Sequence, residues 1–285
     1  MRSLLFTPGN KESMLTRAAA SRPDVLVPDM EDSVADGDKE GARALIAEWL
    51  PRLGQSPALL LPRVNSLRTP WFGDDIAAVA VAGVWGISVG KVESAADISA
   101  ISRALEQNER SAGLEPGSLR LIPWIETALA IVNCYEICRA SDRIAAVAFG
   151  GEDYTADLGV ERLDDESNVV YARSAICNAA RAAGVLALDT PYFQFRDDEG
   201  LKSSCAASRR LGFKGRFAIH PAQIETINAC YSPSAAEIAE ARRIVAAFEE
   251  AESRGRGSTS LDGRVIDVPV VRRARALLAQ AGEAR

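Results

Sequence analysis

The chain has 285 residues, of which 47% are hydrophobic and 25% charged, a balance typical of a globular protein. Its formal net charge of −6 argues against a nucleic-acid-binding surface, which would need a basic stripe. No run approaches the ~20 apolar residues of a membrane span, and Arg2 leads directly into a strand-like segment, so we expect no signal peptide. The five cysteines have no paired spacing, which indicates reduced thiols and a cytoplasmic protein.

Eight short apolar runs recur along the chain, separated by polar segments of helical length. Continuous apolar runs indicate strands that are buried on both faces of a parallel sheet. Because eight strand–helix units are the number that closes an α/β barrel, we predict a (β/α)8 TIM barrel. The predicted strands are Ser3–Thr7, Asp24–Pro28, Ala58–Pro62, Val84–Val89, Leu119–Trp124, Ile144–Phe149, Val185–Leu188 and Phe217–Ile219.

The segments between the strands predict helices with recognisable ends. Ser94 suits an N-cap, with Asp97 three residues further on. Gly184 is a good C-terminal stop, and Pro51 is expected to end the second helix. The predicted helices of the barrel are Asn10–Arg22, Lys39–Leu50, Thr69–Val81, Ser94–Asn108, Thr127–Arg139, Asn168–Ala183, Glu199–Leu211 and Pro221–Ala229.

The barrel should close near residue 230, so we place a catalytic barrel domain at residues 1–230 and a C-terminal helical extension at residues 231–285. The extension contains a strong helix at Ser234–Ser253, a linker at Arg254–Ser260 that is flexible by composition, and a final helix from about Val268. It could form a lid, reach a neighbouring subunit, or pack as a helix on its own barrel.

Two acidic residues follow neighbouring predicted strands. Glu126 comes after the fifth strand and Asp153 after the sixth. Barrels place their chemistry at the C-terminal strand ends, and adjacent strands lie ~4.8 Å apart, so the two carboxylates can converge. Two carboxylates with waters suit Mg²⁺, whereas the single histidine, His220, excludes a histidine-rich zinc site. The alternative is that each acid caps a helix.

Two basic residues occupy the ends of the third and fourth strands. Arg63 could bind a substrate carboxylate through two parallel hydrogen bonds; the alternative is a salt bridge to Asp29, Glu31 or Asp32. Lys91 could be a Schiff-base nucleophile if desolvated, but the nearby acids favour a protonated ion-pair partner. We expect Glu31, Asp32 and Lys91 to surround the metal and its waters without binding the metal directly.

These motifs, taken in order, resemble the citrate lyase β-subunit-like branch of the HpcH/HpaI aldolase superfamily, and the likeness covers nearly the whole chain. Members are TIM-barrel enzymes, commonly trimers or hexamers, that use Mg²⁺ and make or break carbon–carbon bonds next to a CoA thioester or a 2-oxo acid. The matching stretches are Arg2–Asn10, Asp29–Val34, Pro62–Asn65, Gly90–Ser94, Ile125–Thr127, Phe149–Asp153, Phe195–Asp197, Gly212–Gly215, Ala218–Gln223 and Gly263–Pro269.

The resemblance implies roles for residues at the barrel mouth. Glu126 and Asp153 match the family's metal ligands. The match implies that Glu126 also contacts the substrate. Arg63 matches the arginine that binds the substrate's carboxylate or oxo group. Phe6 and Arg17, in the first strand–helix unit, align with residues that line the CoA side.

The resemblance also implies a role for Asp267 in the C-terminal extension. It matches a catalytic acid that, in CoA-using relatives, reaches the active site of a neighbouring subunit. The alternative is local, because an Asp directly before Val268 and Pro269 is also well suited to cap a helix.

The implied function is a Mg²⁺-dependent carbon–carbon lyase that cleaves or forms a β-hydroxyacyl-CoA, such as malyl-, citramalyl- or citryl-CoA, through an acyl-CoA enolate. The alternatives are a CoA-independent 2-oxo acid aldolase, a malyl-CoA-type thioesterase, the lyase subunit of a complex that uses a carrier-bound thioester, and an inactive barrel that serves as a binding module. We expect small acyl-CoA and 2-oxo acid partners, no nucleic acid or membrane, and a homotrimer or hexamer.

Overall fold

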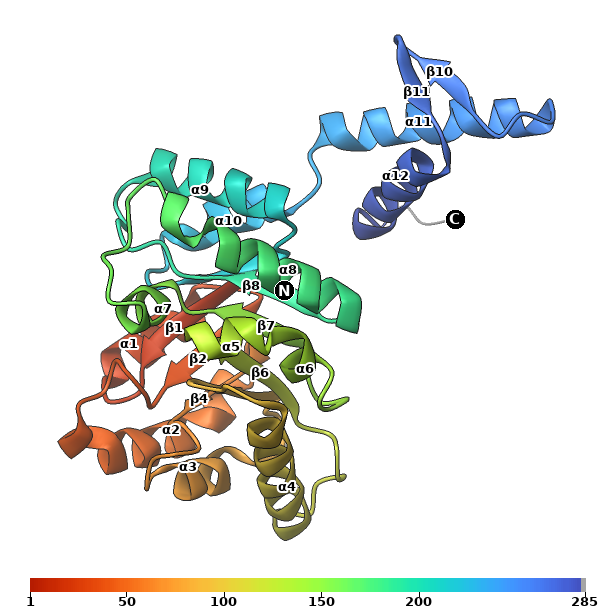
Figure 1. The fold of residues 1–285 in the computed structure, drawn as a ribbon. Helices are drawn as coiled ribbons and strands as arrows, with labels where there is room; N and C mark the ends of the chain where they lie inside the picture. Colours follow the sequence, from red (N-terminus) through yellow and green to blue (C-terminus); the bar gives the residue numbers. More distant parts are fainter. Residues whose placement is uncertain (283–285) are drawn as a thin grey trace. The chain divides into compact units, whose positions relative to one another are not determined.

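A computed structural model describes residues 1–282, which divide into two compact units, Met1–Ile227 and a C-terminal unit that begins at Asn228. The first unit is a closed parallel barrel surrounded by helices, which confirms the predicted TIM barrel (Figure 1). Strand β1 pairs with both β2 and β9, and this pairing closes the sheet. The strands are β1 (Ser3–Pro8), β2 (Val25–Asp29), β3 (Leu59–Leu60), β4 (Arg63–Val64), β5 (Gly86–Val89), β6 (Arg120–Ile125), β7 (Ala146–Phe149), β8 (Leu186–Asp189) and β9 (Gly215–Ala218).

Each of the eight apolar runs overlaps a strand, but the third strand position holds two short strands, β3 within the run and β4 just after it. Leu61 and Pro62 separate β3 from β4, and the proline lacks the N–H that would continue the ladder. Hydrogen bonds to the neighbouring strands continue across this break. The N–H of Leu61 donates to the carbonyl of Leu26, and the N–H of Ser88 donates to the carbonyl of Pro62. The chain therefore keeps its course through the barrel and brings Arg63 to the strand end.

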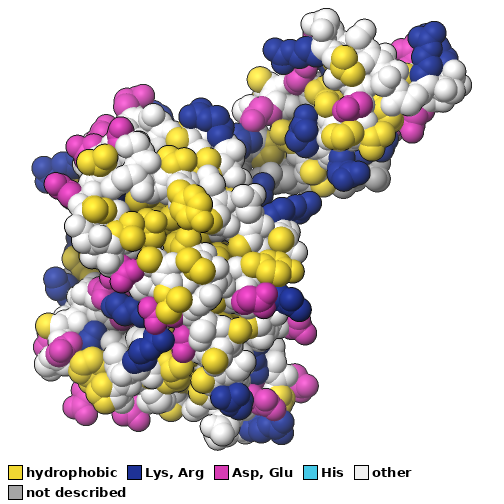
Figure 2. Space-filling model, viewed as in Figure 1, with side chains coloured by type: hydrophobic (Ala, Val, Ile, Leu, Met, Phe, Trp, Pro, Cys, Tyr) yellow, Lys and Arg dark blue, Asp and Glu magenta, His cyan; other side chains and the backbone are white. Residues whose placement is uncertain are grey.

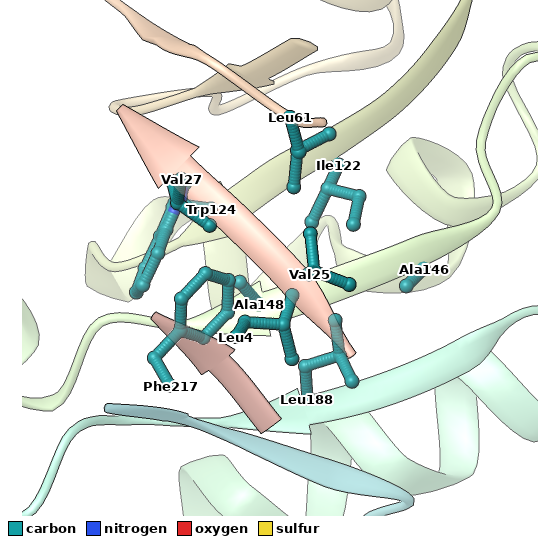
Figure 3. Close-up of a cluster of buried hydrophobic side chains, with 10 residues drawn as sticks. All are labelled: Leu4, Val25, Val27, Leu61, Ile122, Trp124, Ala146, Ala148, Leu188 and Phe217. Atoms are coloured by element: carbon teal, nitrogen blue, oxygen red, sulfur yellow. The ribbon is translucent and has the colours of Figure 1, made fainter. Parts of the chain in front are cut away.

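The barrel interior is filled by apolar side chains from β1, β2, β6, β7, β8 and β9 and from the segment between β3 and β4 (Figure 3). Successive side chains of a strand point to opposite faces, so every second residue points inward. The inward cluster consists of Leu4, Val25, Val27, Leu61, Ile122, Trp124, Ala146, Ala148, Leu188 and Phe217.

Helices alternate with the strands along the chain. They are α1 (Glu12–Ala20), α2 (Lys39–Leu53), α3 (Phe72–Val79), α4 (Ala95–Ser111), α5 (Ala128–Val132), α6 (Cys134–Cys138), α7 (Gly151–Asp157), α8 (Val170–Ala183), α9 (Asp198–Leu211) and α10 (Gln223–Tyr231), with short 3₁₀ turns at Asp36–Asp38 and Ser167–Val169. No helix within the described part of the chain combines the length and the apolar character needed to cross a bilayer.

Two predicted helix ends are confirmed and one is wrong. Ser94 and Asp97 form a capping box at the start of α4, and Gly184 ends α8 in the left-handed conformation. Pro51 does not end α2, which continues to Leu53. The burial of Leu50 and Leu53 holds the last turn, although the proline lacks an N–H.

The single helix predicted at Thr127–Arg139 is also wrong, because α5 and α6 meet at Asn133. The Asn133 side chain donates to the carbonyl of Glu93 at 2.9 Å. This long-range bond fixes Asn133 at the point where the two short helices meet. The short helix α7 was not predicted.

The C-terminal unit contains α11 (Ala235–Ser253), a hairpin of β10 (Thr259–Leu261) and β11 (Arg264–Ile266), and α12 (Val268–Gln280). The flexible linker predicted up to Ser260 is therefore wrong at its end, where β10 begins. Asp262 and Gly263 both have positive φ, as in the tight turns that join antiparallel strands. Phe248, Ile266 and Val271 form the buried core of this unit.

Candidate active site

The predicted site residues follow strands that are neighbours in the barrel. Strands β2, β4, β5, β6 and β7 are consecutive in the sheet. Asp29 ends β2, Arg63 begins the short β4, Lys91 follows β5 and Glu126 follows β6. Asp153 lies in the first turn of α7, just after β7. The parallel sheet thereby gathers one arginine, one lysine and several acids at its carboxyl end.

Most of the guanidinium group of Arg63 binds acidic side chains of the same chain. Its Nε and Nη2 atoms donate to the two carboxylate oxygens of Asp29 at 2.6 and 2.7 Å. Its Nη1 atom lies 2.9 Å from Glu31 and 3.3 Å from Asp32. The salt-bridge alternative is thus present in this structure. Nη1 is the atom that could bind a substrate carboxylate in place of Glu31 and Asp32.

Charge attraction keeps the Arg63–Asp29 pair ionised although it is buried. Burial opposes the charged form of both groups, but the neighbouring opposite charge outweighs it. The pKa of Asp29 consequently lies below its ordinary value, and the pKa of Arg63 lies above it. Asp29 therefore fixes both the charge and the direction of the guanidinium.

Glu126 is a buried carboxylate, 3% exposed, in a space that two glycines leave open. A Cβ atom at Gly150 would lie 2.4 Å from its Oε2 atom, and one at Gly90 would lie 3.0 Å from its Oε1 atom. The backbone N–H of Lys91 donates to Oε1 at 2.5 Å. Burial, Asp153 and Glu31 together raise the pKa of Glu126 to about 8.

Asp153 is partly buried and lies within electrostatic reach of Glu126. Burial and the charge of Asp32 raise its pKa, while Lys91 and Arg63 oppose this change. Within residues 1–282, neither Glu126 nor Asp153 forms a salt bridge. Lys91 and Arg63 therefore offset the charge of these two acids only in part, and the pKa of each carboxyl stays raised.

The donor set fits Mg²⁺. Among the described residues, no three His, Cys, Asp or Glu side chains form a ready-made ligand group. Mg²⁺ commonly takes one or two carboxylates and completes its shell with waters and substrate oxygens. A divalent cation would also favour the charged form of both carboxyl groups, whose pKa is raised first by burial and then by neighbouring acids.

Lys91 is an ion-pair partner in this structure. Its ammonium group donates to Glu31 at 2.8 Å and to Asp32 at 3.3 Å. Burial favours the neutral amine, but Glu31, Asp32 and Glu126 outweigh it and raise the pKa of Lys91. A protonated amine is no nucleophile, so this geometry does not favour Schiff-base chemistry.

Comparison with known protein families identifies the family of the chain. The family described as HpcH/HpaI aldolase/citrate lyase matches residues 2–221. The chain belongs to this family. It is accordingly an enzyme of the carbon–carbon lyase class.

Relatives of this HpcH/HpaI family member are similar over almost their whole length. The citrate lyase subunit beta of Leuconostoc mesenteroides subsp. cremoris is 38% identical, over 97% of this chain and 92% of the relative. The L-malyl-CoA/beta-methylmalyl-CoA lyase of Cereibacter sphaeroides is 35% identical, over 98% and 94%. The solved structure of CitE from Mycobacterium tuberculosis, in complex with magnesium, acetoacetate and coenzyme A, is 30% identical, with a TM-score of 0.80 and coverage of 99% and 98%.

Phe6 and Arg17 lie in different surroundings. The ring of Phe6 stacks on Phe217 and Trp124 at centroid distances of 5.0 and 5.6 Å, and the guanidinium of Arg63 lies 4.5 Å from its centroid. Arg17 is exposed on α1 and donates to the carbonyl of Ser13. Phe6 thus supports Arg63 from the barrel interior; contact of either residue with CoA stays a prediction.

Asp267 caps α12 in the C-terminal unit. Its carboxylate accepts from the N–H of Val270 at 3.2 Å. The capping alternative is therefore present, and this role does not exclude the catalytic one that the family resemblance implies.

Sequence reasoning missed the groups that hold the acidic turn after β2. Lys39 is buried, and its ammonium group donates to the carbonyls of Met30 and Glu31 at 3.0 and 2.8 Å. Asn65 donates to the same Met30 carbonyl at 3.0 Å. Lysine at the first position of a helix carries no burial signal, whereas Asn65, two residues after Arg63, could have been suspected from its strand-end position.

Proposed function

We propose that this HpcH/HpaI family member is a Mg²⁺-dependent lyase that cleaves, or forms, a β-hydroxyacyl-CoA of the malyl-, citramalyl- or citryl-CoA type. The observation that carries the proposal is the carboxylate couple Glu126–Asp153, which forms no salt bridge within residues 1–282 and lies near the ionised Arg63. The names of relatives that act on malyl-CoA, and the CitE complex with magnesium and coenzyme A, support the substrate class and the metal.

Glu126 and Asp153 are the residues that would hold the metal. When bound, Mg²⁺ supplies Lewis-acid stabilisation to the oxygen on which negative charge develops. Gly90 and Gly150 leave the space in which Glu126 keeps its position. Glu31 and Asp32, which are held by Arg63 and Lys91, lie around this pair and can bind waters.

Arg63 would orient the carboxylate or oxo group of the 2-oxo acid part through Nη1. Because Asp29 holds the other edge of the guanidinium, the charge is placed before the substrate arrives. Preorganised positive charge is effective because it needs no rearrangement as the reaction proceeds.

In the cleavage direction, the β-hydroxyl group gives its proton to a general base and the Cα–Cβ bond breaks. The electron pair of that bond moves onto the acyl-CoA fragment as an enolate, and the hydroxyl carbon becomes the carbonyl of the 2-oxo acid. A proton donor must then protonate the enolate carbon. We assign this donor as Asp267 of a neighbouring subunit, on the family resemblance.

A homotrimer or hexamer is part of the proposal. Apolar side chains gather on the barrel face shown in Figure 2, over α5, α7 and α8. Exposed large residues on these elements and just after them include Leu129, Val132, Leu158 and Tyr171. Exposed apolar patches of this kind are typical of protein interfaces.

The test is a panel of CoA thioesters incubated with the isolated chain and Mg²⁺, followed by chromatography of the products. The proposal requires a 2-oxo acid together with a shortened acyl-CoA. Free CoA with an intact hydroxy acid would instead show a thioesterase. Turnover of free hydroxy-oxo acids would show an aldolase, and turnover only of a carrier-bound thioester would show a subunit of a larger lyase.

A further inference from the structure

Lys91 adopts a backbone conformation that its side chain disfavours. Its φ angle is 57°, in the left-handed region that residues with a Cβ atom rarely occupy. Such residues persist only where their surroundings hold them, and they cluster at functional sites. Here the strained residue lies directly beside the Glu126 carboxylate, to which it donates its N–H.

The polar groups of Lys91 are all bound. The N–H contacts Glu126 at 2.5 Å, and the ammonium group contacts Glu31 at 2.8 Å. The remaining group is the carbonyl oxygen, which accepts from Nη1 of Arg68 at 2.6 Å. Arg68 is thus the residue that holds the turn from outside the acidic cluster.

Arg68 also has a second route to Glu126. Its Nη2 atom donates to Glu93 at 2.9 Å, and Glu93 accepts from the hydroxyl group of Thr127 at 3.2 Å. Thr127 directly follows Glu126 and caps α5. The guanidinium of Arg68 therefore binds the turn at Lys91 directly and reaches Thr127, the residue after Glu126, through Glu93.

A simple helix-capping role does not account for Arg68. Arg68 also lies 3.3 Å from Asp97 in the first turn of α4. However, Asp97 already accepts from the N–H groups of Glu93 and Ser94 at 3.0 and 3.1 Å, so the cap of α4 forms without the arginine. An exposed ion pair, such as the one between Arg68 and Asp97, contributes little to the stability of the fold by itself. The contact specific to Arg68 is the one to the Lys91 carbonyl.

We propose that Arg68 is a positioning residue for Glu126, because it locks the left-handed turn at Lys91 that holds this carboxylate. The inference rests on the proposed function in one respect, which is that Glu126 binds a metal ion. Groups that orient metal ligands typically change metal affinity by about 10–100-fold when they are removed.

The first test compares Arg68→Gln and Arg68→Lys with wild type, using Mn²⁺ as the probe ion. We expect Arg68→Gln to weaken Mn²⁺ binding by about 10-fold, measured by electron paramagnetic resonance, and to speed hydrogen exchange in the peptide spanning Lys91 without any metal. Arg68→Lys should restore the Mn²⁺ affinity and the slow hydrogen exchange only in part, because an ammonium group lacks the planar fork that reaches two acceptors. Arg110→Gln is the matched control, since Arg110 forms an exposed ion pair with Glu106 on α4.

The second test separates the backbone of Lys91 from its side chain. Lys91→Gly and Lys91→Ala both lose the ammonium group, but only glycine adopts a positive φ without strain. We expect Lys91→Gly to bind Mn²⁺ several-fold more tightly than Lys91→Ala. Equal affinity of the two variants would show that the turn does not position Glu126 and would overturn the proposal.

The outcomes keep this proposal apart from the proposed function. Wild-type exchange and Mn²⁺ affinity in Arg68→Gln would overturn the positioning role, as would faster exchange confined to the start of α4. A wild-type chain that binds Mn²⁺ but cleaves no thioester would overturn the proposed function alone. A wild-type chain that binds no Mn²⁺ would overturn both.

Discussion

Two carboxylates carry most of the proposed chemistry at the residue scale. Glu126 and Asp153 form no salt bridge among the described residues, and both have a raised pKa. We predict that Glu126→Ala and Asp153→Ala each lower Mg²⁺-dependent turnover by about 10²–10³-fold or more, the range for loss of one preorganised stabilising group. Steady-state rates over a Mg²⁺ titration measure the effect. Glu106→Ala, in an exposed ion pair, is the control, and near-normal Mg²⁺ response in either site variant would contradict the ligand assignment.

Gly150 gives a sharper test, because the change adds one methyl group and removes no charge. A Cβ atom there would lie 2.4 Å from Oε2 and 2.5 Å from Cβ of Glu126, so the carboxylate must move. We predict that Gly150→Ala weakens Mn²⁺ binding and turnover by at least about 10-fold, as expected when a ligand is displaced. Gly41→Ala makes the same change where nothing lies within 4 Å. The idea fails if the two variants have equal Mn²⁺ affinity.

The strand-end positions of the candidate site residues could be predicted from sequence, and so could the acids available to Arg63 and Lys91, but not which acid each of them binds. Periodicity places Arg63, Glu126 and Asp153 near strand ends, because parallel strands share one carboxyl edge. The choice of Asp29 as the bidentate partner of Arg63 depends on side-chain rotamers and on the turn after β2. The same holds for Lys91, whose left-handed backbone has no signal in its residue type.

At the scale of elements, a buried charge cluster joins β8, β9 and α8. Asp189 accepts from Arg173 and Arg216, the latter at 2.6 Å, and all three side chains are buried. Asp189→Asn would leave the buried guanidinium of Arg216 facing a neutral amide, while Arg173 keeps its ion pair with Glu166 at 2.7 Å. Breaking a buried pair by removing one partner typically costs about 3–5 kcal/mol. We predict a loss of this size in the free energy of unfolding at neutral pH, measured by urea denaturation.

The pH dependence of this loss has a defined sign. Burial opposes ionisation of Asp189, but Arg216 and Arg173 outweigh it and lower its pKa below the ordinary 3.8. A group with a lowered folded-state pKa stabilises the fold above its unfolded pKa, and this contribution disappears as pH falls through the folded value. The difference between wild type and Asp189→Asn should therefore be constant near neutrality and shrink below about pH 4. Glu106→Gln, at an exposed pair, should change stability by only about 0–1 kcal/mol.

Elements were predictable where local chemistry decides them. The capping box at Ser94 and the glycine stop at Gly184 act within one turn of helix, so the sequence alone indicates them. The break at Asn133 depends on the Glu93 carbonyl, 40 residues away in sequence, and could not be predicted from α5 and α6 themselves. The hairpin at Thr259–Ile266 had a local signal, the Asp262-Gly263 turn, but the glycine- and serine-rich residues before it favoured a linker.

At the scale of the whole molecule, the proposed reaction needs two units of the chain. The proposed metal ligands, Glu126 and Asp153, belong to the barrel unit, whereas Asp267 belongs to the C-terminal unit. If Asp267 serves the site of a neighbouring subunit, each active site is built from two chains. Two variants that are inactive for different reasons should then complement each other when their subunits are mixed.

We predict that Asp267→Asn and Glu126→Gln are each nearly inactive alone and regain activity after co-refolding or co-expression. Asn keeps the helix cap that Asp267 forms with Val270, so the C-terminal unit should stay folded. In a randomly mixed cyclic oligomer, about a quarter of the sites combine an intact Glu126 with an intact Asp267 from the neighbour. Recovered activity should approach that fraction of wild type. If Asp267 acts within its own chain, no mixed site is intact and no activity returns; if Asp267 only caps α12, the Asp267→Asn variant is active before mixing.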